Sequence, residues 1–306
     1  MTKTTHEQWL EDRRLGIGGS DIGAILGLSP YRTPLDVYLD KTGESKPEDL
    51  SDNQAVHWGI TLEDTIAKEY AKREGVRVRR RNKQFIHPEH VWMRANIDRS
   101  IDGARKVLEC KTAGQYMSAD WGPAGTDQVP ESYLVQVAWY MSILGYPHAD
   151  LAVLIGGRDF RSYQFQRDFE LESMMVRRAK SFWFSNVLAR VPPNPVNNSD
   201  ITTLYSQDSG DTTIATSEIE ALTEKALSQK KQMKALKSDL DDSMLALKMS
   251  MQSASVLESP QGQILATWKK AKDSDVFDKK SFAADHPDIY DKYCSTKQGS
   301  RRMLLK

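Results

Sequence analysis

Cysteine is scarce in this chain of 306 residues, which contains only Cys110 and Cys294. They lie far apart and form no CxxC spacing, which excludes a disulfide framework and a zinc site built from cysteine pairs. Long apolar runs are also missing, because no stretch of about 18 apolar residues occurs. The polar amino-terminal segment lacks the apolar core of a signal peptide. We therefore expect a cytoplasmic protein that does not cross a membrane.

An excess of one charge is absent as well. Lysine and arginine together number 42, and aspartate and glutamate also number 42. The molecule as a whole therefore lacks the basic signature of a nucleic-acid binder, and any attraction for phosphate must come from local clusters. The 39% hydrophobic content is sufficient for a folded core, in one large domain or two ordinary ones.

Apolar periodicity and turn residues predict helices that alternate with short strands. A glycine-rich turn at residues 16–21 precedes a helix through Leu26, with Ser20 or Asp21 placed to cap it. Further helices are expected at residues 57–74, 131–145 and 170–189, with Gly75 and Gly145 as stop signals. Short strands, largely antiparallel, are expected at residues 76–79, 85–87, 92–98, 106–111, 151–155 and 161–165.

A domain boundary is expected where proline and polar residues replace this pattern, from Pro192 to Gly210. The chain then divides into a core at residues 1–210 and a carboxy-terminal extension at residues 211–306. In the extension, apolar residues recur every seven positions from Ile219 to Leu247, which predicts one long helix with an imperfect coiled-coil seam. Residues 255–268 predict a hairpin that turns at Pro260-Gln261-Gly262.

The residues most informative about chemistry are Asp98, Glu109 and Lys111. Glu109 and Lys111 lie two apart on a strand, so both project from one face while Cys110 points into the core. A hairpin between residues 99 and 106 would place Asp98 beside Glu109. Carboxylate oxygens, together with the Cys110 backbone carbonyl, suit Mg²⁺. Lys111 could then orient a water molecule or stabilise developing negative charge.

Two alternatives remain open for this segment. Glu109 and Lys111 could be a solvated charge pair without a ligand, since short motifs also occur by chance. Asp102 is a rival to Asp98 as a ligand, because Asp102-Gly103 could supply the turn of the hairpin.

Five motifs in order give the chain a resemblance to the YqaJ-like viral recombinases, which belong with phage lambda exonuclease to the PD-(D/E)xK nuclease superfamily. The motifs are Arg14-Leu15-Gly16-Ile17-Gly18-Gly19-Ser20-Asp21, Trp58-Gly59 with Glu63, Ala95-Asn96-Ile97-Asp98, Leu108-Glu109-Cys110-Lys111-Thr112, and Tyr133-Leu134-Val135-Gln136-Val137 before Tyr140-Met141. The resemblance covers about residues 8–190. It implies a restriction-endonuclease-like α/β fold, a mixed sheet flanked by helices.

The resemblance also implies roles for single residues. Asp98 and Glu109 would bind the catalytic metal ions, Lys111 would act on the water nucleophile, and Glu63 would complete the environment of a second ion. Gln136 would hold the nucleophile or the scissile phosphate. Two Mg²⁺ ions are expected, and Mn²⁺ can substitute.

Residues outside the metal site carry further expectations. By the resemblance, Arg14 and Ser20 bind the 5′-phosphate, with Arg13 as an alternative counterpart to Arg14. Where many relatives have glycine after the metal-binding aspartate, this chain has Arg99.

A basic cluster that includes Arg77, Arg79 and Arg81 could follow the DNA backbone, or it could be a solvated face. Trp58 and Trp92 are expected in the core, with surfaces on which DNA bases stack as the alternative.

The predicted activity is hydrolysis of linear double-stranded DNA from a 5′ end, which leaves a 3′ single strand for recombination by strand annealing. The resemblance implies a ring-shaped homotrimer, a single-strand annealing protein as partner, and a phage or prophage origin in a bacterial host. The alternatives are a single-strand-specific or helicase-linked nuclease of the same superfamily, and a non-catalytic DNA-binding or assembly protein.

Overall fold

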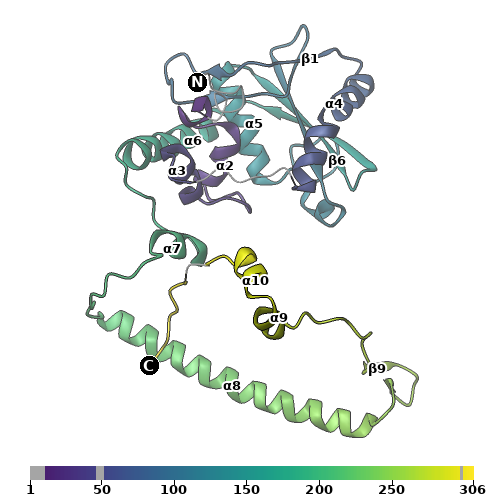
Figure 1. The fold of residues 1–306 in the computed structure, drawn as a ribbon. Coiled ribbons are helices and arrows are strands. Elements are labelled where there is room, and N and C mark those ends of the chain that lie inside the picture. Colours follow the sequence, from purple (N-terminus) through teal and green to yellow (C-terminus); the bar gives the residue numbers. More distant parts are fainter. Residues whose placement is uncertain (1–10, 46–51, 297–298) are drawn as a thin grey trace. The chain divides into compact units, whose positions relative to one another are not determined.

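The computed structural model describes residues 11–45, 52–296 and 299–306. Two compact units make up the chain, Met1–Leu204 and Tyr205–Lys306, and each is described by itself. The first unit contains the central sheet (Figure 1). Both hydrophobic clusters of the described residues also lie in this unit.

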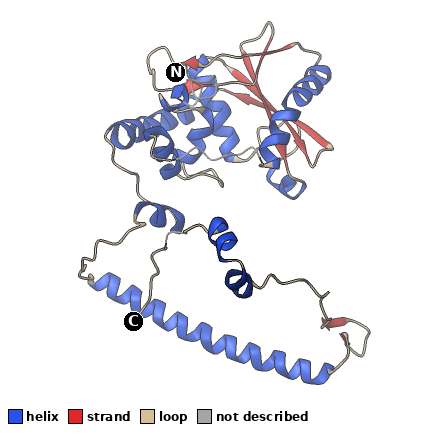
Figure 2. Cartoon of the chain, viewed as in Figure 1, coloured by secondary structure: helices blue, strands red, loops and turns tan. Residues whose placement is uncertain are grey.

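The sheet of the first unit has five strands in the order β1-β4-β5-β6-β7. Their bounds are β1 Val78–Arg80, β4 Arg99–Ile101, β5 Lys106–Ala113, β6 His148–Ile155 and β7 Asp159–Gln166. Strands β5 and β6 pair in parallel, and the other pairs are antiparallel (Figure 2). The predicted mixed sheet with flanking helices is confirmed. The parallel pair needs a long crossover, and helix α5, Glu131–Leu144, lies within it.

Each face of the sheet is covered by helices because residues alternate along its strands. Val107 of β5 and Leu151 of β6 lie in the larger cluster, together with residues of α2 (Gly19–Ile25), α3 (Pro34–Thr42), α5 and α6 (Phe169–Phe182). Leu108 and Cys110 lie in the smaller cluster with Ile66 and Tyr70 of α4, Gln54–Glu74. Cys110 therefore faces the core, as the strand register predicts.

Helix α4 begins three residues earlier than the apolar pattern predicts, because Asn53 caps it. The Asn53 side chain accepts hydrogen bonds from the backbone N–H groups of Ala55 and Val56. The helix ends at Gly75, which adopts a left-handed conformation with φ of 67°. Near this end, Tyr70 donates a hydrogen bond to the buried carboxylate of Asp150 on β6, which fixes the helix to the sheet.

The prediction that Ser20 or Asp21 caps helix α2 is wrong. Gly18 is the cap residue of α2, and neither Ser20 nor Asp21 occupies that position. Asp21 lies in the first turn, and its Oδ2 accepts a hydrogen bond from the Gly18 backbone N–H at 2.9 Å. The carboxylate therefore satisfies a free N–H group from inside the helix, as the second half of a capping box does.

The remaining elements of the first unit are short. The strand expected at residues 92–98 is reduced to β3, Arg94–Ala95, which pairs with β2, Phe85–Ile86. Residues 115–120 form a 3₁₀ helix after β5. The helix expected at residues 170–189 consists of α6 followed by a π-helical turn, Trp183–Leu188. Helix α7 covers Asn198–Leu204.

The second unit is built around helix α8, Ser217–Met251, which confirms the predicted long helix. Strands β8, Val256–Glu258, and β9, Ile264–Thr267, form the predicted hairpin. Two short helices follow, α9 at Lys279–Asp285 and α10 at Pro287–Tyr293. Within the described ranges, no helix has the length and apolar character needed to span a membrane.

Candidate active site

Asp98 lies beside Glu109 because β4 folds back on β5. The register pairs Arg99 with Leu108, so the residue before β4 falls next to Glu109 and Cys110. The Asp98 Oδ2 atom accepts a hydrogen bond from the Cys110 backbone N–H at 2.9 Å. The turn between the strands contains Gly103 with φ of 77°, as expected for Asp102-Gly103.

Glu109 is the centre of the site and has only 3% of its surface exposed. Its Oε1 atom lies 2.7 Å from the Lys111 Nζ and accepts a hydrogen bond from the Gln136 Nε2, also at 2.7 Å. Its Oε2 atom is buried and has no protein partner. Because a buried carboxylate oxygen without a partner costs free energy, the structure favours a ligand at this atom.

The charges of the site support the same conclusion. Burial, together with the neighbouring Glu109 carboxylate, raises the pKa of Asp98 to about 8, although the Cys110 N–H and the Lys111 ammonium act in the opposite direction. Burial lowers the pKa of Lys111, but the carboxylate of Glu109 outweighs it and raises that pKa overall. Lys111 is therefore a cation at neutral pH, whereas Asp98 is largely protonated there unless a further cation stabilises its carboxylate.

These residues fit a divalent metal ion with a preference for oxygen. Asp98, Glu109 and the Cys110 backbone carbonyl offer hard ligands, and Mg²⁺ keeps several waters and substrate phosphates as its other ligands. No group of three or more His, Cys, Asp or Glu side chains suited to a metal ion occurs among the described residues. The chain therefore provides a small, open ligand set and not a closed cage.

Glu63 takes a different partner from the one expected. Its Oε1 atom forms an ion pair with the Arg99 Nη1 at 2.6 Å, so the carboxylate is bound to the first residue of β4. It still contributes to the raised pKa of Asp98, as the smallest of the causes. The expected role of Glu63 at a second metal ion remains a prediction, and the structure adds Arg99 to the site.

Asp102, the rival ligand, lies in the β4–β5 turn and forms an ion pair with Arg79 at 3.2 Å. Asp98, by contrast, is hydrogen-bonded to the strand that carries Glu109 and Lys111. The geometry favours Asp98.

Tyr140 belongs to the site although the sequence argument gave it no role. The Gln136 Nε2 donates to the Tyr140 hydroxyl at 2.9 Å as well as to Glu109, so one amide joins both residues. The signal was available, because residues four apart on a helix share a face. The Tyr140 ring lies over Gly19, where an added Cβ would come within 2.4 Å of the ring.

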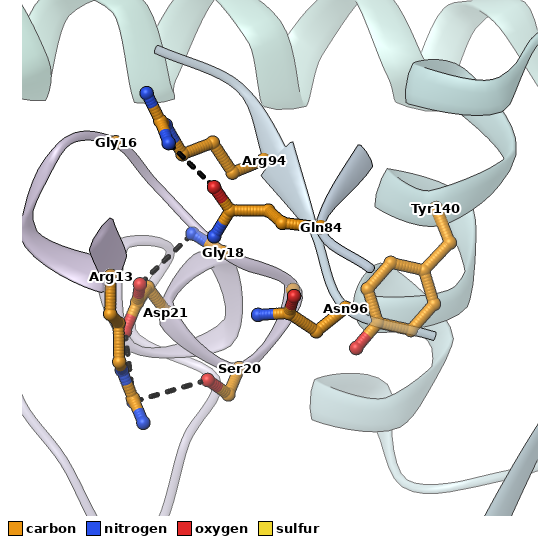
Figure 3. Close-up of a pocket in the computed structure, with 10 residues that line it drawn as sticks. Arg13, Gly16, Gly18, Ser20, Asp21, Gln84, Arg94, Asn96 and Tyr140 are labelled. Atoms are coloured by element: carbon orange, nitrogen blue, oxygen red, sulfur yellow. Dashed lines mark hydrogen bonds and ion pairs between the residues drawn. The ribbon is translucent and has the colours of Figure 1, made fainter. Parts of the chain in front are cut away.

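A cavity of about 160 Å³ lies next to these residues, lined by Arg13, Ser20, Asn96 and Tyr140 among others (Figure 3). The Arg13 Nη2 donates to the Ser20 hydroxyl at 3.5 Å. Arg14, the expected phosphate ligand, does not line this cavity, and its guanidinium lies near Gly43 at the end of α3. Consecutive helical residues point about 100° apart, which explains why only one of the two arginines reaches Ser20.

At the wall of the cavity, the fully buried carboxylate of Asp21 forms ion pairs with three cations. It lies 2.7 Å from the Lys41 Nζ, 2.9 Å from the Arg32 Nη1 and 3.7 Å from the Arg13 Nη2. Burial raises the pKa of Asp21, but Lys41, Arg13 and Arg32 outweigh it and hold that pKa well below its usual range. This cluster fixes the position of Arg13, and local sequence patterns did not predict it.

Two other expectations meet different outcomes. Trp92 is buried in the larger cluster, whereas Trp58 is 51% exposed, so its expected place in the core is wrong. Trp58 lies near the start of α4, outside the face that packs on the sheet.

In the basic cluster, Arg79 pairs with Asp102 and Arg81 donates a hydrogen bond to Ser100, whereas Arg77 is exposed.

Comparison with known proteins finds a family that matches the amino-terminal part of the chain. Residues 8–147 match the model of the YqaJ-like viral recombinase domain. The Uncharacterized protein YqaJ of Bacillus subtilis (strain 168) is 42% identical over 194 residues, which are 63% of this chain and 60% of that protein. The match therefore leaves part of that relative without a counterpart, since it spans 60% of the relative's length.

The solved structures that match part of the chain include two exonucleases. An alkaline exonuclease (LHK-Exo) from Laribacter hongkongensis has a TM-score of 0.47 and 14% identity, over 60% of this chain and 94% of the exonuclease. A phage-related exonuclease from Haemophilus somnus 129PT has a TM-score of 0.44 and 14% identity, over 57% of this chain and 96% of the other.

Proposed function

Because residues 8–147 match the YqaJ-like viral recombinase domain, we propose that the chain is a magnesium-dependent exonuclease. It hydrolyses linear double-stranded DNA from a 5′ end and leaves 3′ single-stranded tails. The observation that carries this proposal is the pair of the half-buried Asp98 and the buried Glu109, whose Oε2 atom lacks a protein partner, beside the Lys111 ammonium.

Each residue of the site has its own role in phosphodiester hydrolysis. Asp98, Glu109 and the Cys110 carbonyl would hold the metal, with Glu63 beside a second ion, and Mn²⁺ can replace Mg²⁺. When bound, the metal lowers the pKa of a water and neutralises charge on the phosphate. Lys111, which stays protonated, stabilises negative charge as it develops and does not abstract a proton. Gln136 fixes the orientation of Glu109 through its amide N–H.

We place the 5′-phosphate in the cavity beside Tyr140, with Ser20 and Arg13 as its ligands (Figure 3). Arg13 takes the role that the sequence argument gave to Arg14, because it lies next to Ser20 and is held by Asp21. A guanidinium suits a terminal phosphate because it can donate two hydrogen bonds to it. The exposed Arg77 and Arg80 could contact the backbone of the same DNA.

The remaining parts of the proposal concern the assembled molecule. We propose that the chain acts as a ring-shaped homotrimer around DNA, together with a single-strand annealing protein, in the cytoplasm of a bacterial host. A ring reconciles DNA binding with the balanced numbers of 42 basic and 42 acidic residues, since clustered positive charge can line a channel.

A digestion experiment with the full chain tests the proposal. Linear duplexes with a 5′-phosphate or a 5′-hydroxyl, single strands and closed circles are incubated with Mg²⁺ or with a chelator. We expect degradation of linear duplexes from the 5′ end only when Mg²⁺ is present, faster with a 5′-phosphate, and no loss of closed circles. Faster digestion of single strands would instead favour the single-strand-specific alternative.

The variant Lys111→Ala separates catalysis from binding. We expect cleavage to fall at least about 100-fold, because a charge that stabilises the transition state is removed, while duplex binding changes little. Lys72→Ala, an exposed lysine on α4, serves as the control and should cleave normally. Normal cleavage by Lys111→Ala would overturn the mechanism.

A further inference from the structure

Arg99 is buried between the metal-site hairpin and helix α4, with its side chain only 3% exposed. Its Nη1 atom lies 2.6 Å from the Glu63 Oε1 and donates to the backbone carbonyl of Asp98 at 2.9 Å. Its Nη2 atom donates to the Asp64 Oδ1 at 3.2 Å. One guanidinium therefore connects β4 to two carboxylates of α4.

The planar, forked shape of guanidinium explains why an arginine can fill this place. Its N–H donors point in fixed directions and stay charged at any physiological pH, whereas a lysine offers one compact charge. The bond to the Asp98 carbonyl also ties Arg99 to the residue that precedes it, so the cation cannot move without disturbing the metal-site strand.

The arrangement distributes the charges of the site into two pairs. Lys111 lies against Glu109 on one side, and Arg99 lies against Glu63 on the other. Among the described residues of the site, the buried carboxylate oxygen without a protein partner belongs to Glu109, whereas the Oε1 atom of Glu63 is paired with Arg99. A cation that binds between Asp98 and Glu109 can therefore use a carboxylate oxygen that has no protein partner. A cation at the Glu63 Oε1 atom has to compete with Arg99.

We infer that Arg99 is a positioning residue of the metal site, which holds Glu63 on helix α4 so that Asp98 and Glu109 bind one ion tightly and a second ion only weakly. This inference rests on the proposed function, since it requires that the site binds divalent metal.

Mn²⁺ binding to the full chain, without DNA, tests this inference by titration followed by electron paramagnetic resonance. The wild-type chain is expected to bind one ion tightly. In Arg99→Met the Glu63 carboxylate loses its partner, so we expect either an affinity about tenfold higher for the first ion or a second ion of comparable affinity. Arg73→Met, which removes an exposed arginine–glutamate pair elsewhere on helix α4, should leave Mn²⁺ binding unchanged.

A double variant distinguishes positioning from a general effect on folding. Glu63→Gln removes the charge that Arg99 holds, so Arg99→Met should no longer alter Mn²⁺ binding in the Glu63→Gln background. Arg99→Lys keeps the charge without the fork and should fall between the wild type and Arg99→Met. Thermal unfolding in the presence of a chelator verifies that each variant is folded, which is expected because Glu63 is 24% exposed and can be hydrated.

Two results would overturn the inference. One is Mn²⁺ stoichiometry and affinity in Arg99→Met that stay within about twofold of wild type. The other is an effect of Arg99→Met that persists at full size in the Glu63→Gln background. If the wild-type chain binds no Mn²⁺ at all, the proposed function itself fails, and if only the 5′-end preference fails while these responses occur, the inference stands.

Discussion

Gln136 shows how one side chain can join a metal ligand to its surroundings. Its amide donates to both Glu109 and Tyr140, and it is only 8% exposed. In Gln136→Leu, Glu109 keeps Lys111 but loses the amide that fixes its orientation. We expect cleavage of linear duplex DNA to fall about 10- to 100-fold, as is typical when a residue that orients a metal ligand is removed.

The rate is measured as initial cleavage at saturating Mg²⁺, alongside metal affinity. Ser142→Ala is the matched control, because it removes a buried hydrogen bond from the same helix, to Glu172, away from Glu109. Equal losses in the two variants would mean that Gln136 acts only on stability.

The two tryptophans near the site differ in their surroundings and therefore in their predicted contributions to stability. Trp92 is 5% exposed and its ring lies close to those of Trp139 and Phe184, whereas Trp58 is 51% exposed. Trp92→Ala should lower the free energy of unfolding by about 3–5 kcal/mol. Trp58→Ala should lower it by less than about 1 kcal/mol. Urea unfolding of both variants measures the difference, and a comparable loss at the two positions would contradict it.

At the scale of the element, helix α2 depends on the ionised form of Asp21. The pKa of Asp21 in the folded protein is held well below its usual range. At acidic pH, the unfolded chain therefore binds a proton at this residue that the folded chain does not bind. Stability from this group is therefore fully present above the unfolded pKa of about 3.9 and is lost as the pH falls further. We expect a steep loss of stability below about pH 4.

The variant Asp21→Asn tests this dependence. It leaves the fully buried Lys41 ammonium without its carboxylate, so we expect the free energy of unfolding at pH 7 to fall by about 3–5 kcal/mol. The acid-dependent loss should also become shallower. Asp40→Asn, which removes a partly exposed carboxylate beside the same arginines, is the control and should show neither effect at this size.

Elements with strong local signals could be predicted from the sequence, and elements that depend on distant partners could not. Gly75 and Gly145 marked the ends of α4 and α5, and the spacing of Glu109 and Lys111 gave the face of β5. The Arg99–Glu63 pair joins residues 36 apart, and the Lys41–Asp21 pair joins two different helices. The periodicity of the sequence does not predict such contacts, because they are determined by tertiary packing alone.

The exposure of Trp58 shows a second limit. Its hydrophobicity favoured the core, but α4 already covers the sheet with Ile66, Ala67 and Tyr70. The sequence shows how much apolar surface the helix has, but it does not show which turn of the helix will be buried.

At the scale of the molecule, the first unit has what it needs to fold alone. Every residue of both hydrophobic clusters lies between positions 17 and 204. Asp98, Glu109 and Lys111 lie in the same range. We expect a fragment of residues 1–204 to unfold cooperatively in urea and to bind Mn²⁺ with an affinity within about twofold of the full chain. A fragment that binds the dye ANS and lacks a cooperative transition would contradict this expectation.

The second unit leaves apolar surface uncovered along α8. In this helix, Met251 is the only buried residue, and Met233, Leu236 and Leu240 are 71%, 68% and 59% exposed. A seam with heptad spacing is stabilised when another helix packs against it. We therefore expect the full chain to self-associate through α8, and the double variant Leu236→Lys with Leu240→Lys to lower its molar mass in light scattering after size-exclusion chromatography.

The control for this experiment adds the same two charges outside the seam. Ala235→Lys with Ser238→Lys changes neighbouring positions that a heptad register turns away from the seam. The control should keep the molar mass of the wild type. If both double variants keep that mass, α8 is not the interface, and any ring must be assembled by the first unit, which the molar mass of the 1–204 fragment would then show directly.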